Sequence, residues 1–296
     1  MSSANISDWL YSFSSDAEKF KALREKFQPK KAVTISIASG KGGVGKTSIA
    51  VKLAKELSKK DYKVLLIDCD FNLSNTSIKL NLPINNRFHD LLTSNISFDE
   101  CLYKLDNLHI LPAANGNLDI FHENFQMYEV IIDIIYSHEE DYDYIILDSP
   151  AGISKDSVNL SAYCNYRLIV ATPDRSSITD SYSLIKLLAK NYEIKENHLI
   201  VNMLSHKKQF AKVVQTISET AENFLNVRTQ VLGGLKKYDF PTDCFDKYFI
   251  ETEDSSAHKD FAKLVSSFTE KISRRYHQGM LSQSKTTTES ALFDIQ

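Results

Sequence analysis

The chain is poor in the features that build metal clusters, disulfide frameworks and membrane spans. Its 296 residues include four cysteines, which lie far apart at Cys69, Cys101, Cys164 and Cys244. Because no two of them form a C-x-x-C pair, the spacing indicates neither a zinc site nor a redox pair and fits free, buried thiols in the cytosol. No run of about 18 apolar residues occurs, so we expect no segment to cross a membrane.

An excess of basic charge is also missing. The formal net charge is −3, which provides no overall attraction to nucleic acid. The first ten residues show no basic stretch followed by an apolar one, so we expect a cytoplasmic protein whose membrane contact is at most peripheral, at the inner face of the cell membrane. His89, His109, His122 and His138 are scattered, and we assign no metal to them.

Glycine is scarce, yet four of the nine glycines fall in one short stretch. The segment Ser39-Gly40-Lys41-Gly42-Gly43-Val44-Gly45-Lys46-Thr47 follows a buried-strand pattern at 33–38 and precedes apolar residues at helical spacing up to Leu57. A strand, a glycine loop, Lys-Thr and a helix in this order are typical of a phosphate-binding loop. We therefore predict that nucleotide is bound by Gly40, Lys41, Gly42, Gly43, Val44, Gly45, Lys46, Thr47 and Ser48.

Lys46 and Thr47 have separate expected tasks in this loop. Lys46 should reach the β- and γ-phosphates, and the Thr47 hydroxyl should bind Mg²⁺.

An apolar run ending at Asp148 is a Walker B pattern, whose carboxylate should hold Mg²⁺ mostly through water. Asp68 and Asp70 follow another strand, where a carboxylate lies in the ligand crevice and can orient a metal or activate water. The alternative is that these two aspartates only cap a turn.

The alternation of strands and helices predicts an α/β fold. Strand patterns at 33–38, 64–68, 108–111, 167–171 and 198–202 alternate with helical ones, which indicates a doubly wound, mostly parallel sheet with helices on both faces. We expect three parts. They are an N-terminal extension at 1–30 with a short amphipathic helix at about 16–27, a P-loop ATPase domain at 31–276, and a flexible polar tail at 277–296.

The sequence from Lys41 to Thr47 resembles the deviant Walker A motif of the MinD/ParA family. The resemblance extends over about residues 31–275. It implies a slow, switch-like Mg²⁺-ATP hydrolase that forms an ATP-dependent homodimer. In such a dimer, Lys41 would reach the partner's phosphates. Asp70 would position or deprotonate the attacking water, with Asp68 nearer the Mg²⁺. Catalysis would therefore fall to Asp70, Lys41 and Lys46.

Two further residues receive roles from the same resemblance. Pro150-Ala151-Gly152 is similar to the family's second switch, which implies that the N–H of Gly152 senses the γ-phosphate. Asn202 falls where the family places an asparagine that reads the adenine edge; the alternative is a turn asparagine at a strand end. After Gly233 the chain departs from the family's usual loop over the base, which leaves the adenine contacts and the preference for ATP open.

One branch of the family fits best. The stretch from Thr172 to Lys186 resembles the flagellar-number ATPases of the FlhG/FleN branch, and Asp16–Arg24 resembles their "DQAxxLR" activator motif with two extra residues. This implies control of flagellar number and placement through protein partners. The partners would be an SRP-type flagellar GTPase, contacted by residues 16–27, and a transcription regulator or a flagellar component. We predict no specific nucleic acid partner.

Other readings stay open. A cell-division MinD would carry a membrane-binding C-terminal helix, which the Ser/Thr-rich tail at 282–296 does not resemble, and a DNA-partitioning ParA would need a basic surface. A P-loop tyrosine kinase would have tyrosines at 277–296, where none occurs. An iron–sulfur reductase would need a cysteine pair such as Cys101 and Cys164 in a glycine-flanked context. A module that holds ATP without cleaving it is the remaining alternative.

Overall fold

The computed structural model describes residues 32–70, 75–113 and 126–272. The predicted helix at 16–27 and the predicted tail at 277–296 lie outside these residues. The predicted division into three parts therefore stays a prediction. Within the described residues, no helix is long and apolar enough to cross a membrane.

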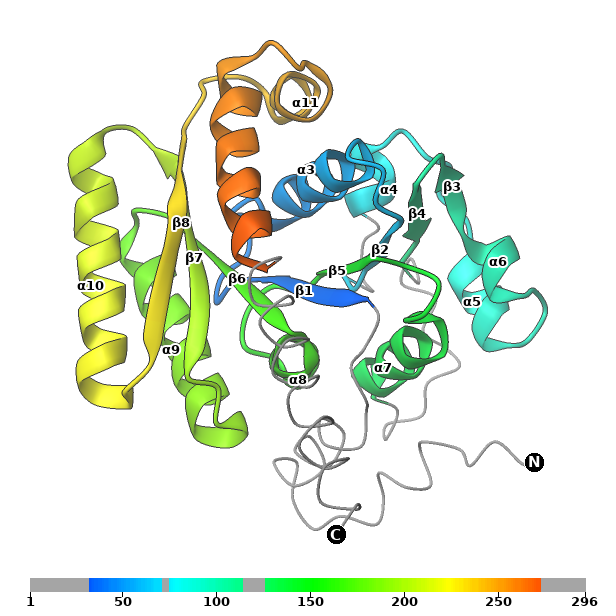
Figure 1. Cartoon of the computed structure of the whole chain (residues 1–296), viewed down its shortest axis with the longest axis horizontal. Helices are drawn as coiled ribbons and strands as arrows, with labels where there is room; N and C mark the ends of the chain where they lie inside the picture. The colour runs from blue at the N-terminus through cyan, green and yellow to red at the C-terminus, as the bar shows by residue number, and fades with distance from the viewer. Residues whose placement is uncertain (1–31, 71–74, 114–125, 273–296) are drawn as a thin grey trace, which may run out of the picture.

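A twisted sheet forms the centre of the described structure (Figure 1). Its eight described strands lie in the order β3-β4-β2-β5-β1-β6-β7-β8, and every neighbouring pair is parallel except β3 with β4. The strands are β1 (Val33–Ala38), β2 (Val64–Asp68), β3 (Tyr103–Leu105), β4 (Leu108–Leu111), β5 (Tyr144–Asp148), β6 (Tyr166–Ala171), β7 (Glu196–Leu204) and β8 (Arg228–Lys236). The predicted doubly wound α/β fold is confirmed.

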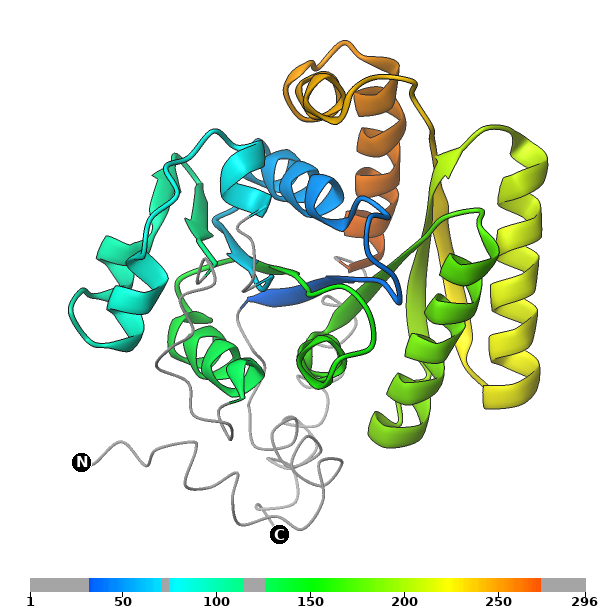
Figure 2. The same ribbon diagram turned by 180° about the vertical axis from the view of Figure 1, so that it is seen from behind.

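Helices cover both faces of this sheet, as Figure 1 and the reverse view in Figure 2 show. One face carries α3 (Lys46–Ser58) and a helix at 256–272, and the other carries α7, α8, α9 and α10. The bounds of the latter four are Met127–His138, Lys155–Tyr163, Arg175–Tyr192 and Lys207–Leu225. Shorter elements are α4 (Asn75–Lys79), α5 (Arg87–Leu92), α6 (Phe98–Cys101), α11 (Thr242–Asp246) and the π-helical turn η1 (Lys247–Glu251).

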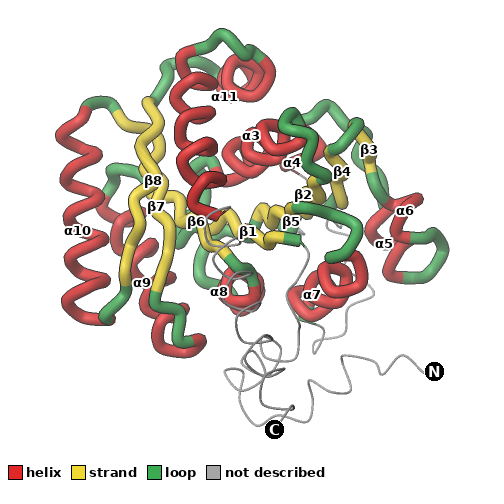
Figure 3. The backbone as a smooth tube through the Cα atoms, viewed as in Figure 1, coloured by secondary structure: helices red, strands yellow, loops and turns green. Residues whose placement is uncertain are grey.

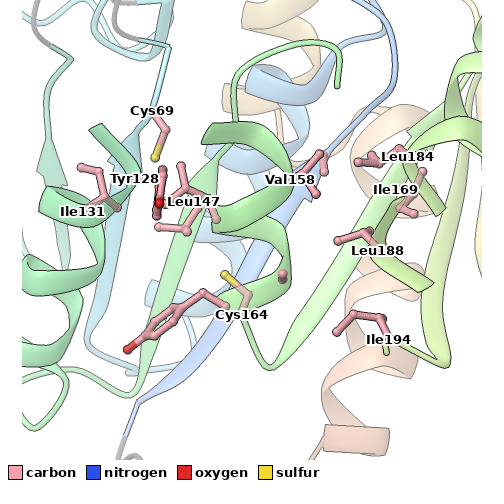
Figure 4. Packing of buried hydrophobic residues seen from close by; sticks show 14 of the residues in the cluster. Cys69, Tyr128, Ile131, Leu147, Val158, Cys164, Ile169, Leu184, Leu188 and Ile194 are labelled. Atoms are coloured by element: carbon pink, nitrogen blue, oxygen red, sulfur yellow. The ribbon is translucent and has the colours of Figure 1, made fainter. Parts of the chain in front are cut away.

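The central strands are apolar because both of their faces are covered. Every residue of β1, β2 and β5 is buried, as expected for parallel strands between two helical layers. Figure 4 shows one of the two cores, where Leu147 and Ile169 from the sheet lie among side chains of the α7–α9 layer, including Val158 and Leu184. Because these strands are packed on both faces, the residues at their carboxyl ends hold defined positions.

The strand order changes direction at β1, which lies between β5 and β6. Ligands of open α/β sheets bind beyond the carboxyl ends of the strands at such a switch point. Figure 3 colours the loops at the strand ends green, and because β1 and β5 are parallel neighbours in register, the loops that leave them begin beside each other. The glycine loop after β1 is therefore at the position where this fold holds a ligand.

A buried ion pair in α3 also contacts η1 and the helix at 256–272. The Lys52 side chain is fully buried, and its Nζ lies 3.2 Å from Glu56 Oε1 and 3.2 Å from the carbonyl oxygen of Ile250 in η1. The same Nζ lies 2.5 Å from Nδ1 of His258 in the helix at 256–272. One lysine thus joins three elements.

We expect Lys52→Met to lower the free energy of unfolding by about 3–5 kcal/mol, because it leaves the Glu56 carboxylate buried without its cation. The double variant Lys52→Met/Glu56→Leu should recover most of this loss. Urea denaturation measures both. Lys59→Met is the control, since Lys59 pairs with Glu253 at an exposed site and should cost less than about 1 kcal/mol. A Lys52→Met cost no larger than the control's would contradict this role.

Candidate functional site

The loop between β1 and α3 has the geometry of an anion cradle. Gly43 and Gly45 adopt the left-handed backbone conformation, with φ of 74° and 91°. The first intrahelical hydrogen bond runs from Ile49 N–H to the Gly45 carbonyl at 3.1 Å. The N–H groups of the three preceding helical residues, Lys46 to Ser48, therefore point out of the helix N-terminus, where an anion is favoured.

Two glycines of the loop are required by packing. A Cβ at Gly40 would lie 2.1 Å from the backbone carbonyl carbon of Asp180 in α9, and one at Gly45 would lie 2.6 Å from Asn202 Nδ2. Such distances are too short for any side chain. These glycines therefore allow the loop to pack directly on α9 and β7, in addition to their place in a phosphate-binding loop.

Asn202 braces the loop from β7. Its Nδ2 donates to the Val44 carbonyl at 2.8 Å, and its Oδ1 accepts from the N–H of Met203 at 2.8 Å. In this structure both ends of the amide thus have protein partners. The predicted adenine contact stays a prediction, and reading a base would require the amide to exchange one of these bonds.

Lys46 is buried at the centre of the site. Its Nζ donates to Ser39 Oγ at 3.0 Å. Burial lowers the pKa of Lys46, and the negative charges of Asp148 and Asp70 oppose this shift. The lysine therefore lies within electrostatic reach of the carboxylates that end β5 and β2.

Asp68 and Asp148 occupy paired positions on the neighbouring strands β2 and β5. Burial, and next the charge of Asp148, raise the pKa of Asp68 well above its usual range. Burial also raises the pKa of Asp148 to about 6. Two buried carboxyls this close cannot both ionise easily without a nearby cation.

The residues present fit Mg²⁺. Both carboxylate oxygens of Asp148 are buried and have no hydrogen-bond partner among the described residues, although the Thr47 hydroxyl is near enough to lower the pKa of this carboxyl. The oxygens of Asp68 accept the N–H groups of Asp70 at 3.1 Å and Thr76 at 3.2 Å. No group of three acidic, His or Cys side chains forms a closed metal cage in the described parts of the chain. Mg²⁺ needs none, because it keeps waters and takes phosphate oxygens.

Asp70 lies at the edge of this cluster. It is half-buried, and its Oδ2 accepts from Asn75 Nδ2 at 3.3 Å. Unlike Asp68 and Asp148, it is thus partly open to solvent, two residues after the end of β2.

Lys41 points away from the buried cluster and is held by the start of α9. Its Nζ donates to Asp174 Oδ1 at 3.0 Å and to Ser176 Oγ at 2.8 Å, and its side chain is 42% exposed. No local sequence pattern predicts Asp174 as a partner of Lys41, because the two residues lie 133 positions apart. Asp174 also caps α9 by accepting the Ser177 N–H at 2.9 Å.

The environment of Asp174 keeps it charged. Burial opposes ionisation, but hydrogen bonds from Thr172, Ser176 and the Ser177 N–H, together with the contact to Lys41, hold the pKa of this carboxyl well below its usual range. The aspartate is thus a permanent anion facing Lys41 at neutral pH.

Gly152 connects the Walker B strand to the loop. Its φ is 87°, and its N–H donates to the Ser39 carbonyl at 3.1 Å. The predicted contact with a γ-phosphate would therefore require this hydrogen bond to be exchanged. The structure thus brings all the predicted site residues together at one edge of the sheet.

The chain after β8 closes the site with aromatic residues. A small cavity beside Asn202 and Ile49 is lined by Tyr238, Phe245 and Phe249. The rings of Phe245 and Phe249 stack with centroids 5.3 Å apart. No sequence pattern predicts this aromatic cluster, although the departure from the family's usual loop after Gly233 marks the segment as unusual.

The fold and the site define a P-loop nucleotide-binding protein, with a glycine loop at the switch point of a doubly wound sheet and a Walker B carboxylate beside it. A family model described as an AAA domain matches residues 32–201, which is more than half of the chain. The chain belongs to the MinD/ParA family of P-loop ATPases.

Several relatives support this assignment. The antiactivator FleN of Pseudomonas aeruginosa is 28% identical over 67% of this chain and 71% of its own length. The septum site-determining protein MinD of Synechocystis is 35% identical over 68% and 74%. The flagellum site-determining protein YlxH of Helicobacter pylori is 31% identical over 68% and 69%. Among solved structures, MinD of Aquifex aeolicus covers 81% of this chain and 97% of its own, with 27% identity and a TM-score of 0.59.

The buried carboxyl of Asp148 leads to a pH-dependent prediction. Because its pKa in the folded state is about 6, above the usual 3.8, the native state is favoured by the protonated form and loses stability as the pH rises through about 6. Without Mg²⁺ or nucleotide, Asp148→Asn should therefore be more stable than the wild type at pH 7.5, by about 3 kcal/mol, and the difference should shrink toward pH 5.

Urea denaturation at the two pH values measures this difference. Asp254→Asn is the control, because the Asp254 side chain is fully exposed and its replacement should leave stability almost unchanged at both pH values. A stability difference between Asp148→Asn and wild type that stays constant with pH would contradict the assignment.

Proposed function

We propose that this protein is a Mg²⁺-ATP-dependent dimerising ATPase switch that controls the number and placement of flagella through protein partners. The observation that carries the proposal is the position of Lys41. This lysine belongs to the phosphate loop, yet it lies half exposed at the surface and contacts α9. A loop lysine placed this way is available to the nucleotide of a second subunit.

The chemistry needs charge neutralisation and an oriented water more than covalent assistance. The loop N–H groups and Lys46 would bind the phosphates, and Thr47, Asp148 and Asp68 would hold Mg²⁺, which supplies further positive charge to the phosphoryl group. Asp70 is half-buried and lies near Lys46, which supports a role in positioning the attacking water. Gly152 N–H would leave the Ser39 carbonyl to sense the γ-phosphate.

Dimerisation would move Lys41 from its present partner. In one subunit Lys41 is held by Asp174 and Ser176, and an ATP-bound partner would offer it phosphate oxygens instead. ADP lacks the γ-phosphate, so hydrolysis would remove part of that attraction and return Lys41 to Asp174. The equilibrium between the two partners of Lys41 would thus set the lifetime of the dimer.

The flagellar output is supported by a relative named as a flagellum site-determining protein, YlxH, and by the antiactivator FleN, whose branch of the family the stretch from Thr172 to Lys186 resembles. The SRP-type GTPase partner rests on residues 16–27, which lie outside the described residues, and a transcription regulator or a flagellar component is the further partner class. A MinD-type role in cell division, with peripheral membrane contact, is the second candidate, because the Synechocystis septum protein is 35% identical to this chain.

Solution mass measured by light scattering tests the switch. We expect wild type to be a monomer with Mg²⁺-ADP and to cycle through a dimer with Mg²⁺-ATP. Asp70→Ala should remain a dimer in ATP because it cannot position the water, and Lys41→Ala should remain a monomer. Lys186→Ala on an exposed face of α9 is the control for loss of a surface lysine. A mass that does not respond to nucleotide in any of the four proteins would refute the cross-subunit role of Lys41.

Counting flagella and septa in cells that lack the gene distinguishes the two biological outputs. We expect flagellar number or position to change, with wild type restoring it and Lys41→Ala failing to do so. A chain without residues 1–30 should still dimerise with ATP but fail to restore placement. Displaced septa with normal flagella would instead favour the division role.

A further inference from the structure

Asp246 connects two parts of the nucleotide site that lie far away in the sequence. Its Oδ1 accepts from Ser48 Oγ at 2.8 Å, and its other oxygen pairs with Nζ of Lys79. Ser48 belongs to the first turn of α3, and Lys79 is the last residue of α4. The carboxylate and the lysine are largely buried, with side chains only 12% and 15% exposed, so this is a built contact and not a surface ion pair.

The backbone around Asp246 is unusual. Asp246 ends α11, and the next residues form the π-helical turn η1. Single π-helical turns are rare and occur frequently at functional sites. The same segment supplies Phe245 and Phe249 to the cavity beside Asn202, so one short stretch contacts the cavity, α3 and α4 together.

The contact with Ser48 conflicts with a bound phosphate. Ser48 presents one of the N–H groups at the start of α3 that point toward an anion, and its hydroxyl belongs to the same residue. A phosphate at that N–H would stand near the Asp246 carboxylate, whose side chain is only 12% exposed, so the two like charges would repel each other. Asp246 and a nucleotide therefore compete for the same end of α3.

Lys79 would lose its partner if a phosphate displaced the Asp246 carboxylate. Its positive charge already acts on Asp148, where, after Lys46, it lowers the carboxyl's pKa against the effect of burial. The Lys79 ammonium and the Ser48 hydroxyl contact the same Asp246 carboxylate, so the lysine lies close to the start of α3. In the present structure its ammonium group is neutralised by Asp246.

We propose that Asp246 is a positioning residue that senses nucleotide: phosphate binding at Ser48 displaces its carboxylate, and Lys79 is released toward the phosphates together with α4. This inference rests on the proposed nucleotide binding and adds a third lysine to Lys46 and Lys41. It also couples occupancy of the site to α4, which follows the segment that carries Asp68 and Asp70. The segment 242–251 thus releases its contacts with α3 and α4 when nucleotide binds.

Equilibrium binding of Mg²⁺-ADP and Mg²⁺-ATP to Asp246→Asn tests the proposal. Asparagine keeps the shape and can still accept from Ser48, but it carries no charge to repel phosphate. We expect nucleotide affinity to rise about 3- to 10-fold. The double variant Lys79→Met/Asp246→Asn should gain clearly less than Asp246→Asn, because the released lysine is then missing and only the lost repulsion remains. Asp239→Asn is the matched control, since Asp239 lies in the same segment with an exposed side chain that contacts Lys237.

The sign of the change separates this role from a purely structural one. If Asp246 only supports the fold of the site, Asp246→Asn will bind nucleotide more weakly than wild type, and the proposal is wrong. Unchanged affinity, or a gain equal to that of Asp239→Asn, also overturns it. If wild type itself binds no nucleotide, the proposed function fails and this inference fails with it. Urea denaturation verifies that each variant is folded.

Discussion

Two buried carboxyls at the ends of neighbouring strands, Asp68 and Asp148, impose the constraint on which the site depends. Their register places them side by side, and burial raises the pKa of each. Such a pair is stable in its charged form only near cations. Lys46 supplies one positive charge within the chain, and the orphaned oxygens of Asp148 leave room for Mg²⁺ to supply more.

The glycine loop supplies the positive charge that the buried carboxylates require. It must bring Lys46 and several N–H groups to the carboxylates while it packs against α9 and β7. The loop backbone has little room to move. A Cβ at Gly40 would clash with Asp180, and the Asn202 amide donates a hydrogen bond to the Val44 carbonyl. Lys41 emerges from this rigid loop at the surface, where Asp174 holds it. Rigid placement of Lys46 and exposed placement of Lys41 are therefore consequences of one packing arrangement.

The sheet and the acidic and glycine motifs could be predicted because their signals are local. Apolar runs mark β1, β2 and β5, and Gly40 to Thr47 are adjacent in the sequence. Asp174 and Asp246 could not be found this way, since they reach Lys41 and Ser48 across 133 and 198 residues. The cap of α9 is likewise seen only in the structure, where the Asp174 carboxylate accepts the Ser177 N–H. Only the folded chain shows these pairings.

Calorimetric titration of wild type with ATP, once with Mg²⁺ and once with EDTA, tests the central claim most directly. If Asp68 and Asp148 need a cation beside the phosphates, Mg²⁺ should strengthen ATP binding at least about tenfold, since each factor of ten corresponds to about 1.4 kcal/mol. ATP binding that is equally tight without Mg²⁺, or no binding in either buffer, would contradict the assignment of this edge of the sheet as a Mg²⁺-nucleotide site.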